Sequence, residues 1–334
     1  MKKTYYLFNP GRLSRKDNTL KFVGMDEEGN ELKPRYIPVE GISDLYVFGA
    51  LDANSALYNF LGKQQIAVHF FDYYENYTGS FMPKEYLLAG KMLVAQTLRY
   101  TQHRKRIPIA RKFVEGAAFN MLKNLRYYHN RNKDLEAEIT TIEELVQMFP
   151  SCKTVPELMG VEGNIRQVYY GAFDTILKGF EMGGRSKRPP KNEINALISF
   201  GNMMCYTTCL REIYHTQLNP TISFLHEPGE RRYSLALDIA EIFKPILVDR
   251  VIFKVINKGE IQPRDFVKEL NRIVLKESGK KAFIRAYEER LNETIKHRTL
   301  KRSVSYRHLV RLECYKLAKH VLDIEEYKPF KIWW

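Results

Sequence analysis

Two acids interrupt an apolar stretch late in the chain, and a histidine stands a short loop before them. The stretch Phe224 to Lys244 reads FLHEPGERRYSLALDIAEIFK. Asp238 and Glu241 are three residues apart, so a helix over Leu235 to Phe243 would place both carboxylates on one face. Burying carboxylates among Leu, Ile, Ala and Phe is costly unless a cation or a hydrogen-bond donor meets them. With His226 upstream, this composition is typical of a divalent-metal site.

A further carboxylate, Glu162, is flanked by small residues. Gly163 follows it and Gly160 lies two positions before it, at what we expect to be the start of a helix. A metal or phosphate can approach such an acid closely, although an acid near a helix N-terminus is also common capping chemistry. Together with His226, Asp238 and Glu241, it makes three carboxylates and one imidazole. This set suits Mg²⁺ or Mn²⁺, and its lack of a thiolate argues against structural zinc.

The elements that would position these residues differ along the chain. Up to about residue 82, short strands alternate with turn residues, and the dipeptide Met82-Pro83 marks a boundary. After it, apolar residues recur near the helical period. We therefore predict an α+β fold, with a β-sandwich-like domain over residues 1–84 and a larger all-α domain over residues 85–334. In that second domain we expect Ser234 to cap the acid-bearing helix, Pro245 to end it, and the chain from Asp265 onward to be helical.

Composition limits the class of protein. The chain has 334 residues and 44% hydrophobic content, enough for two domains with a sizeable core. It contains no apolar run of the roughly 20 residues that span a bilayer, and its N-terminus has no signal-peptide core. Its four cysteines, Cys152, Cys205, Cys209 and Cys314, form no C-x-x-C pair and no zinc-finger spacing, and we expect Cys205 and Cys209, four residues apart on a helix, to be core thiols. We expect a cytoplasmic protein that does not bind membranes.

The net charge of +14 is concentrated in two segments. Residues 99–133 hold ten Lys or Arg against Glu115 alone, and residues 296–319 hold eight against Glu313 alone. These basic segments carry +9 and +7, with tyrosines interleaved, which indicates a polyanion such as nucleic acid as partner. The plainer alternative is a pair of solvated helix faces.

A series of short motifs, taken in order, resembles one known family. The motifs are Ile42-x-x-Leu45-x-x-Phe48-Gly49, Ile66-Ala67-Val68-x-Phe70, Leu158-Met159-Gly160-Val161-Glu162-Gly163, Arg188-Pro189-Pro190 with Ile194 to Gly201, Leu218-Asn219-Pro220, Phe224-Leu225-His226-Glu227-Pro228, and Ser234 to Glu241. They cover essentially the whole chain and resemble the CRISPR-associated integrase and nuclease of spacer acquisition, the Cas-one family. The Tyr-rich N-terminus and the Trp333-Trp334 end look like subtype I-B.

The resemblance implies roles for single residues. It assigns metal ligation to Glu162, His226 and Glu241, and places Asp238 beside the metal as a fourth catalytic position. Many family members have Asp where Glu241 stands, so the ligand is kept but is one methylene longer. For DNA contacts we expect basic residues of the GGRSKRPPK linker and of the second basic segment: Arg185, Lys187, Arg188, Arg298, Arg302 and Arg307.

The implied reaction is Mg²⁺- or Mn²⁺-dependent phosphoryl transfer on double-stranded and branched DNA. A 3′-hydroxyl attacks a phosphodiester of the CRISPR array, and the same site acts as an endonuclease. The resemblance also implies a homodimer through the β-rich domain. Two such dimers would join a small ferredoxin-like partner (Cas-two) in a heterohexamer, with an iron–sulfur nuclease (Cas-four) as a further partner.

Two other functions remain open from the sequence. One is a non-catalytic DNA-binding scaffold of the acquisition complex, against which the intact Glu162, His226 and Glu241 argue. The other is a metallohydrolase of small substrates, against which the two basic segments argue. A rise in melting temperature with Mn²⁺ would count against the scaffold, and competition by DNA would count against the small-substrate enzyme.

Overall fold

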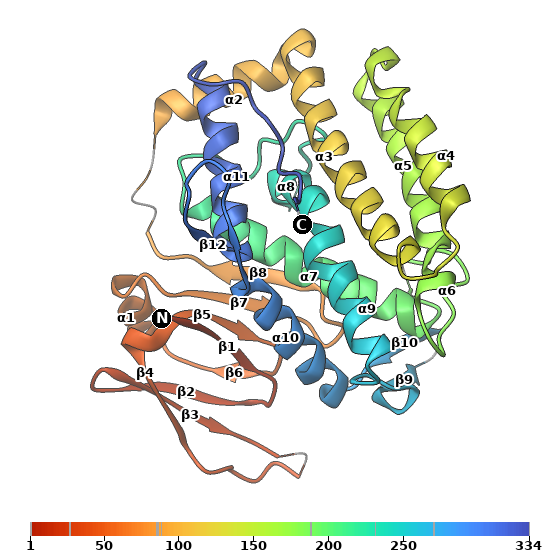
Figure 1. The fold of residues 1–334 in the computed structure, drawn as a ribbon. Helices are drawn as coiled ribbons and strands as arrows, with labels where there is room; N and C mark the ends of the chain where they lie inside the picture. The colour runs from red at the N-terminus through yellow and green to blue at the C-terminus, as the bar shows by residue number, and fades with distance from the viewer. Residues whose placement is uncertain are drawn as a thin grey trace. The chain divides into compact units, whose positions relative to one another are not determined.

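The computed structural model describes residues 2–26, 28–84, 87, 89–187, 189–230, 232–269 and 271–333 (Figure 1). It divides into two compact units, Met1–Tyr86 and Leu87–Trp334. The fold is α+β, as predicted, with a β-rich N-terminal region and a helical C-terminal region. Arg188 and Trp334, which carried part of the sequence interpretation, lie outside the described residues.

The N-terminal unit contains two four-stranded sheets. One has the order β1-β5-β7-β8 and the other the order β4-β3-β2-β6. The strands are β1 (Lys3–Leu7), β2 (Gly11–Lys16), β3 (Thr19–Gly24), β4 (Arg35–Pro38), β5 (Ile42–Val47), β6 (Leu51–Asp52), β7 (Ala67–Phe71) and β8 (Tyr77–Phe81). β5 pairs in parallel with both β1 and β7, whereas β2 and β3 form an antiparallel hairpin.

Alternating side chains build the core of this unit. In β3, Leu20 and Phe22 are buried while their neighbours are half-buried, the pattern of a strand with one face on a core. They join residues of the other sheet, such as Leu45 and Val68, in one hydrophobic cluster. Helix α1 (Ser55–Lys63) adds Leu61 to it and begins at Asn54, whose side chain accepts a 3.0 Å hydrogen bond from the Leu57 amide.

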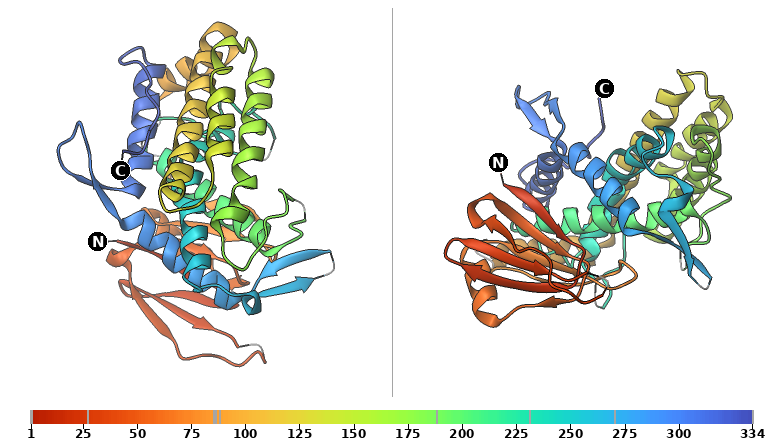
Figure 2. Two further views of the ribbon diagram at one scale, coloured as in Figure 1. Left: turned by 45° about the vertical axis from the view of Figure 1, so that its right-hand side comes forward. Right: turned by 90° about the horizontal axis from the view of Figure 1, so that it is seen from below.

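The second unit is built mainly from helices. They are α2 (Gly90–Thr101), α3 (His103–His129), α4 (Glu136–Val146), α5 (Val155–Gly171), α6 (Phe173–Ile176), α7 (Glu193–Tyr214), α8 (Ser234–Lys244), α9 (Arg250–Asn257), α10 (Glu277–Asn292) and α11 (Tyr306–Val321). Short 3₁₀ turns cover Val39–Gly41 in the first unit and Phe149–Ser151 and Pro263–Asp265 in the second. Helices α3, α4 and α5 lie side by side (Figure 2), and α3 and α7 both pack on α8.

Helix α8 lies at the centre of this unit. Every residue from Ser234 to Phe243 except Leu237 is buried, the two acids included. The prediction for its N-terminus is wrong, because Tyr233 occupies the N-cap position and the Ser234 hydroxyl instead donates a 2.7 Å hydrogen bond to the Thr221 carbonyl. The prediction for its C-terminus is confirmed, because α8 ends at Lys244 with Pro245 as its C-cap. The sequence did not indicate that a π-helical turn (Pro245–Asp249) follows directly and leads into α9.

The prediction that the chain is all helical after Asp265 is also wrong. Two hairpins interrupt it: β9 (Phe266–Glu269) with β10 (Arg272–Leu275), and β11 (Thr294–Lys296) with β12 (Ser303–Ser305). Both project from the helices (Figure 2). β-branched residues such as Ile273 and Val304 favour strands, and Lys301 adopts a positive φ of 55° in the connecting turn.

The fold also bears on the predictions about the cysteines and about membrane-spanning segments. Cys205 and Cys209 are buried, as predicted for core thiols, and Cys152 and Cys314 are buried as well; all four are free. Within the described residues, no helix combines the length and the apolar character needed to cross a membrane.

Candidate active site

Helix α5 presents Glu162 from its middle. Thr154 caps this helix by accepting a 3.3 Å hydrogen bond from the Glu157 amide, eight residues before Glu162. The expectation that Glu162 stands at a helix start is therefore wrong, and capping chemistry does not explain it. One turn later on the same face, Arg166 donates from Nε to the Glu162 carboxylate.

The loop before α8 is held by Asp238. Its carboxylate accepts hydrogen bonds from three successive backbone amides, those of Phe224 (2.7 Å), Leu225 (2.9 Å) and His226 (2.9 Å). It also accepts a 2.8 Å bond from Nδ1 of the His226 ring. A carboxylate has only acceptors, so Nδ1 is the donor in this hydrogen bond and the ring presents its other nitrogen, Nε2, toward Glu241. Asp238 is completely buried and acts through His226.

Glu241 joins the two halves of the site. Its Oε2 accepts from Nη2 of Arg166 and its Oε1 accepts a 2.8 Å bond from Nζ of Lys244. Oε1 also lies 3.8 Å from Nε2 of His226. The structure therefore brings Glu162, His226, Asp238 and Glu241 together, and places Arg166 between the first and the last of them.

The donor atoms suit a divalent cation, but the two glutamate carboxylates are already paired with the side chains of Arg166 and Lys244. Among the described residues, no group of three or more His, Cys, Asp or Glu side chains could hold a metal ion as it stands. The reason is local, because Arg166 and Lys244 occupy the carboxylate oxygens of Glu162 and Glu241. Two mostly buried carboxylates and the His226 imidazole form the oxygen and nitrogen set that Mg²⁺ or Mn²⁺ accepts. These donors fit the ion by their chemistry, and the ion would take the place of the contacts that Arg166 and Lys244 make.

Charge balance in this buried region is set by the same groups. Burial alone would lower the pKa of Arg166, but the Glu162 carboxylate, together with Tyr170 and Asp249, outweighs burial and holds that pKa above its ordinary value. The pKa of Lys244 is lowered, first by burial and then by the positive charge of Arg166. Arg166 and Lys244 thus offset the charges of Glu162 and Glu241 in this mostly buried region.

Two of the predicted DNA-binding residues lie near this centre. Arg185 donates a 2.7 Å hydrogen bond to Oδ1 of Asn195 and a 3.3 Å bond to the Ser199 hydroxyl. Lys187 is exposed over much of its side chain. Its pKa is lowered, first because neighbouring groups partly shield its ammonium from water, and then by the charges of Arg185 and Arg166.

The other three described residues of that prediction lie on the β11–β12 hairpin and at the start of α11. Arg298 lies over the Trp333 ring at 5.6 Å, and Arg302 is exposed at the end of the hairpin turn. Arg307 contacts both carboxylate oxygens of Glu288, at 2.9 and 2.8 Å. The structure does not join these three to Glu162 or Glu241 by any contact that it describes.

The basic segments are partly used inside the fold. In the first, Arg106 of α3 donates a 2.8 Å hydrogen bond to the Phe224 carbonyl and a 2.6 Å bond to Glu227, so it anchors the His226 loop. In the second, Arg311 donates a 2.7 Å bond to the buried Glu212. The count of charges along the sequence therefore overstates the charge that these segments offer to a polyanion.

The sequence interpretation missed Arg166 and Lys244. Each had a signal in its spacing, because Arg166 stands four residues after Glu162 and Lys244 three after Glu241, both on the same helix face as the acid. It also missed Asp249, a buried carboxyl group at the end of the π-helical turn. No local pattern marks Asp249, since tertiary packing alone brings it near Arg166.

Comparison with known proteins finds one family. Residues 5–289 match the sequence model of a family described as "CRISPR associated protein Cas1". The chain is 47% identical to the CRISPR-associated endonuclease Cas1 of Fusobacterium nucleatum, over 100% of this chain and 98% of that protein. It is 50% identical to an endonuclease Cas1 of Thermodesulfovibrio yellowstonii, over 99% and 100% of the two chains.

Solved structures show the same fold. A CAS1 protein from Thermotoga maritima superposes with a TM-score of 0.84 at 38% identity, covering 96% of this chain and 97% of that one. A casposase bound to its integration product superposes at 0.88 with 21% identity, over 99% and 93% of the chains. A chain of a Cas6-RT-Cas1–Cas2 complex superposes at 0.83 with 18% identity, over 100% of this chain and 36% of that one. The last two likenesses concern the fold alone.

Proposed function

The chain belongs to the Cas1 family of CRISPR-associated proteins, and from that premise we propose that it is a metal-dependent DNA integrase and endonuclease that inserts new spacers into a CRISPR array. The observation that carries the proposal is the convergence of Glu162, Glu241 and Nε2 of His226 on one place, with Asp238 fixing the imidazole. A non-catalytic scaffold has no need of this arrangement.

The residues divide into those that hold a cation and those that hold phosphate. A divalent ion, Mg²⁺ or Mn²⁺, held by Glu162, His226 and Glu241 would stabilise charge on the attacked phosphate and activate the attacking oxygen. Asp238 keeps the proton on Nδ1 of His226 and so presents Nε2 for ligation. Arg166 balances the two carboxylates in the absence of the ion.

Phosphate contacts come from cations around this centre. Lys187 is exposed and close enough to Arg166 and Lys244 for their charges to lower its pKa, so it is placed to bind a phosphate beside the carboxylates. We assign the same role to Arg185 and Arg188 of the linker, and a more distant backbone contact to Arg298, Arg302 and Arg307. Binding through such contacts releases counterions and should weaken steeply with salt.

Partners follow from the same proposal. The Cas6-RT-Cas1–Cas2 likeness supports Cas2, the Cas-two of the resemblance, as a partner of this chain in a heterohexamer with two homodimers. The homodimer would form through the N-terminal unit, with Cas4 (Cas-four) as an additional partner in a subtype I-B system. Four free buried thiols suit the reducing cytoplasm.

Strand transfer on a branched DNA substrate tests the function. With Mn²⁺ or Mg²⁺ and Cas2 present, wild type should join strands, and Glu162→Gln, His226→Ala and Glu241→Gln should each lose at least about 100-fold in rate while still binding DNA. Glu144→Gln, which removes an exposed acid of α4, is the matched control and should retain full activity.

Two results would change the assignment. Full activity in the three variants would refute the ligand set. An inert wild type that binds branched DNA normally, with Cas2 and either metal present, would make the scaffold the better description.

A further inference from the structure

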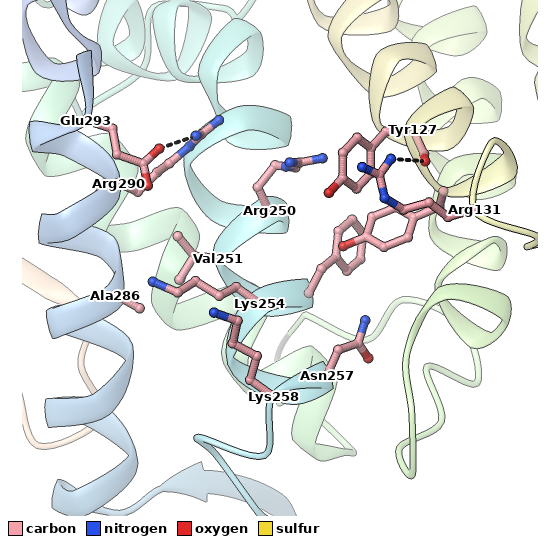
Figure 3. A pocket seen from close by; sticks show the side chains of 12 residues that line it. Tyr127, Arg131, Arg250, Val251, Lys254, Asn257, Lys258, Ala286, Arg290 and Glu293 are labelled. Atoms are coloured by element: carbon pink, nitrogen blue, oxygen red, sulfur yellow. Dashed lines mark hydrogen bonds and ion pairs between the residues drawn. The ribbon is translucent and has the colours of Figure 1, made fainter. Parts of the chain in front are cut away.

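A second concave site lies in the helical unit, between the end of α3, helix α9 and the C-terminal half of α10 (Figure 3). It is a cavity of about 340 Å³, a size in the range of pockets that hold small ligands. None of the four candidate catalytic residues is among the described residues that line it. Six charged side chains line it: Arg131, Arg250, Lys254, Lys258, Arg290 and Glu293.

The cations of this pocket outnumber its acids. Five of the six charged lining groups are positive and one is negative, so the lining carries a net charge of +4. Glu293, already in this count, pairs with Arg290, and Glu289 outside the lining contacts Lys254 at 2.7 Å. Gathering five cations from three segments of the chain around one cavity makes its electrostatic potential favourable for an anion.

Helix α9 explains how the charges gather. Arg250 and Lys254 are one turn apart, and Lys258 follows one turn later at the C-cap, so all three project from one face. The other face buries Val251, Ile252, Val255 and Ile256 in the core. Cations at a helix C-terminus are favoured by the helix dipole, which accounts for Lys254 in the last turn and Lys258 at the C-cap. It does not account for Arg131 and Arg290, which come from other helices.

Aromatic rings hold part of the site in place. The guanidinium of Arg131 lies 3.7 Å from the centre of the Tyr127 ring, and that of Arg250 lies 4.1 Å from it. Tyr128 packs edge-on against Phe253 at 5.2 Å, and burial raises the pKa of its phenol. The wall of the pocket therefore combines guanidinium groups fixed by stacking with a tyrosine that keeps its proton as a donor.

We propose that this pocket binds the phosphate group of a nucleotide, either a free nucleotide or one residue of a nucleic-acid strand. A phosphate carries up to two charges and several acceptor oxygens, which guanidinium forks and lysine ammonium groups together can satisfy. The half-buried Tyr127 and Tyr128 in the wall provide the apolar contact that a sugar and base need. An acidic peptide could pair with the cations, but it has no base to contact the aromatic side chains of this wall.

Direct binding measurements on the full chain test the proposal without any catalytic step. Calorimetry with dAMP and fluorescence anisotropy with a labelled single-stranded oligonucleotide should both be run at one fixed salt concentration. The pocket variant is Lys254→Gln with Lys258→Gln, and Lys258→Glu alone is a second variant at an exposed position. The matched control removes two exposed lysines elsewhere, by Lys268→Gln with Lys281→Gln.

The two probes distinguish the sources of phosphate. A loss of about tenfold in dAMP affinity in the pocket variants alone supports a free nucleotide. If dAMP does not bind wild type but the oligonucleotide binds about tenfold more weakly to the pocket variants alone, the phosphate belongs to nucleic acid. Equal affinities of pocket and control variants for both probes would overturn the proposal. So would tighter binding of tetraglutamate than of dAMP. Because no strand transfer is measured, failure of the proposed function leaves these outcomes unaffected.

Discussion

The Nδ1 atom of His226 donates a 2.8 Å hydrogen bond to Oδ1 of Asp238, a carboxylate with no exposed surface. The same carboxylate accepts three backbone amide hydrogen bonds from the loop that carries the histidine. Asp238 thus fixes the backbone and the ring of His226 together. It is a positioning residue, whereas Glu162 and Glu241 face the place where chemistry is proposed.

Replacing Asp238 by Asn should disturb the backbone and the ring of His226 without removing any of the three proposed metal ligands. An amide nitrogen cannot accept, so some of the four hydrogen bonds are lost, and the free energy of unfolding should fall by about 1–3 kcal/mol. Strand transfer should fall by about 10- to 100-fold, with DNA affinity unchanged. A nitrogen NMR spectrum of the His226 ring provides the decisive readout, because the proton should no longer be fixed on Nδ1. An unchanged ring spectrum would contradict the positioning role.

The proposed divalent ion would compete with Arg166 for the carboxylates of Glu162 and Glu241. In Arg166→Gln, Glu162 and Glu241 face each other without the guanidinium, so the melting temperature of the metal-free protein should fall. Added Mn²⁺ should then raise the melting temperature more than in wild type, because an ion that binds the native state stabilises it in proportion to its affinity. Thermal melts with and without Mn²⁺ measure this difference.

Arg285→Gln is the control for that experiment. Arg285 is an exposed arginine of α10 that pairs with Glu260 at 3.7 Å, so its loss should leave the Mn²⁺ response unchanged. Equal Mn²⁺ responses in Arg166→Gln and wild type would show that the guanidinium does not occupy the ion's place.

The acid-bearing parts of the site could be read from the sequence because their signals are local. A buried carboxylate requires a partner, and the partners of Asp238 and Glu241 are indeed a histidine loop and two cations. Helix spacing alone is enough to predict Arg166 and Lys244 as partners of the two glutamates. The π-helical turn that follows α8 could not be predicted, since such a turn is stabilised by packing that no short window reveals.

For the two basic segments, by contrast, the sequence could not predict which side chains remain available to a ligand. Summed along the sequence they suggest two continuous surfaces, but Arg106 and Arg311 are committed to Glu227 and Glu212 in the fold. Which arginines serve structure and which remain for a ligand depends on long-range contacts. The pocket formed by α3, α9 and α10 is the clearest example, because its cations come from three separate segments.

Gly163 permits a test of close approach to Glu162. A methyl group built at Gly163 would meet no atom within 4 Å, so nothing in the fold itself requires glycine there. Gly163→Ala should stabilise α5 by up to about 1 kcal/mol, and the melting temperature should rise. If DNA or its phosphate approaches this face, strand transfer should nevertheless fall. Gly171→Ala, at the end of the same helix and equally unobstructed, should stabilise without lowering activity. Full activity in Gly163→Ala would exclude close approach at this position.

Asp249 should make stability depend on pH. Its carboxyl group is 2% exposed, one oxygen lacks a hydrogen-bond partner among the described residues, and Tyr169, Arg166, Lys244 and Arg185 surround it. Burial raises its pKa to about 7, against the opposing effect of the Tyr169 hydrogen bond and the three cations. Between the ordinary value of 3.8 and about 7, the folded protein holds a proton that the unfolded chain has released. The free energy of unfolding must therefore fall as pH rises through this window.

Comparison with Asp249→Asn isolates this effect from all other titrations. The amide stays neutral, so the variant should not show the loss. Urea unfolding at about pH 5 and about pH 8 should give a decrease in the free energy of unfolding that is about 3 kcal/mol larger for wild type than for the variant. The variant should accordingly be the more stable protein at the higher pH. Parallel pH profiles for the two proteins would mean that Asp249 is already ionised in the fold, with the cations around it outweighing its burial.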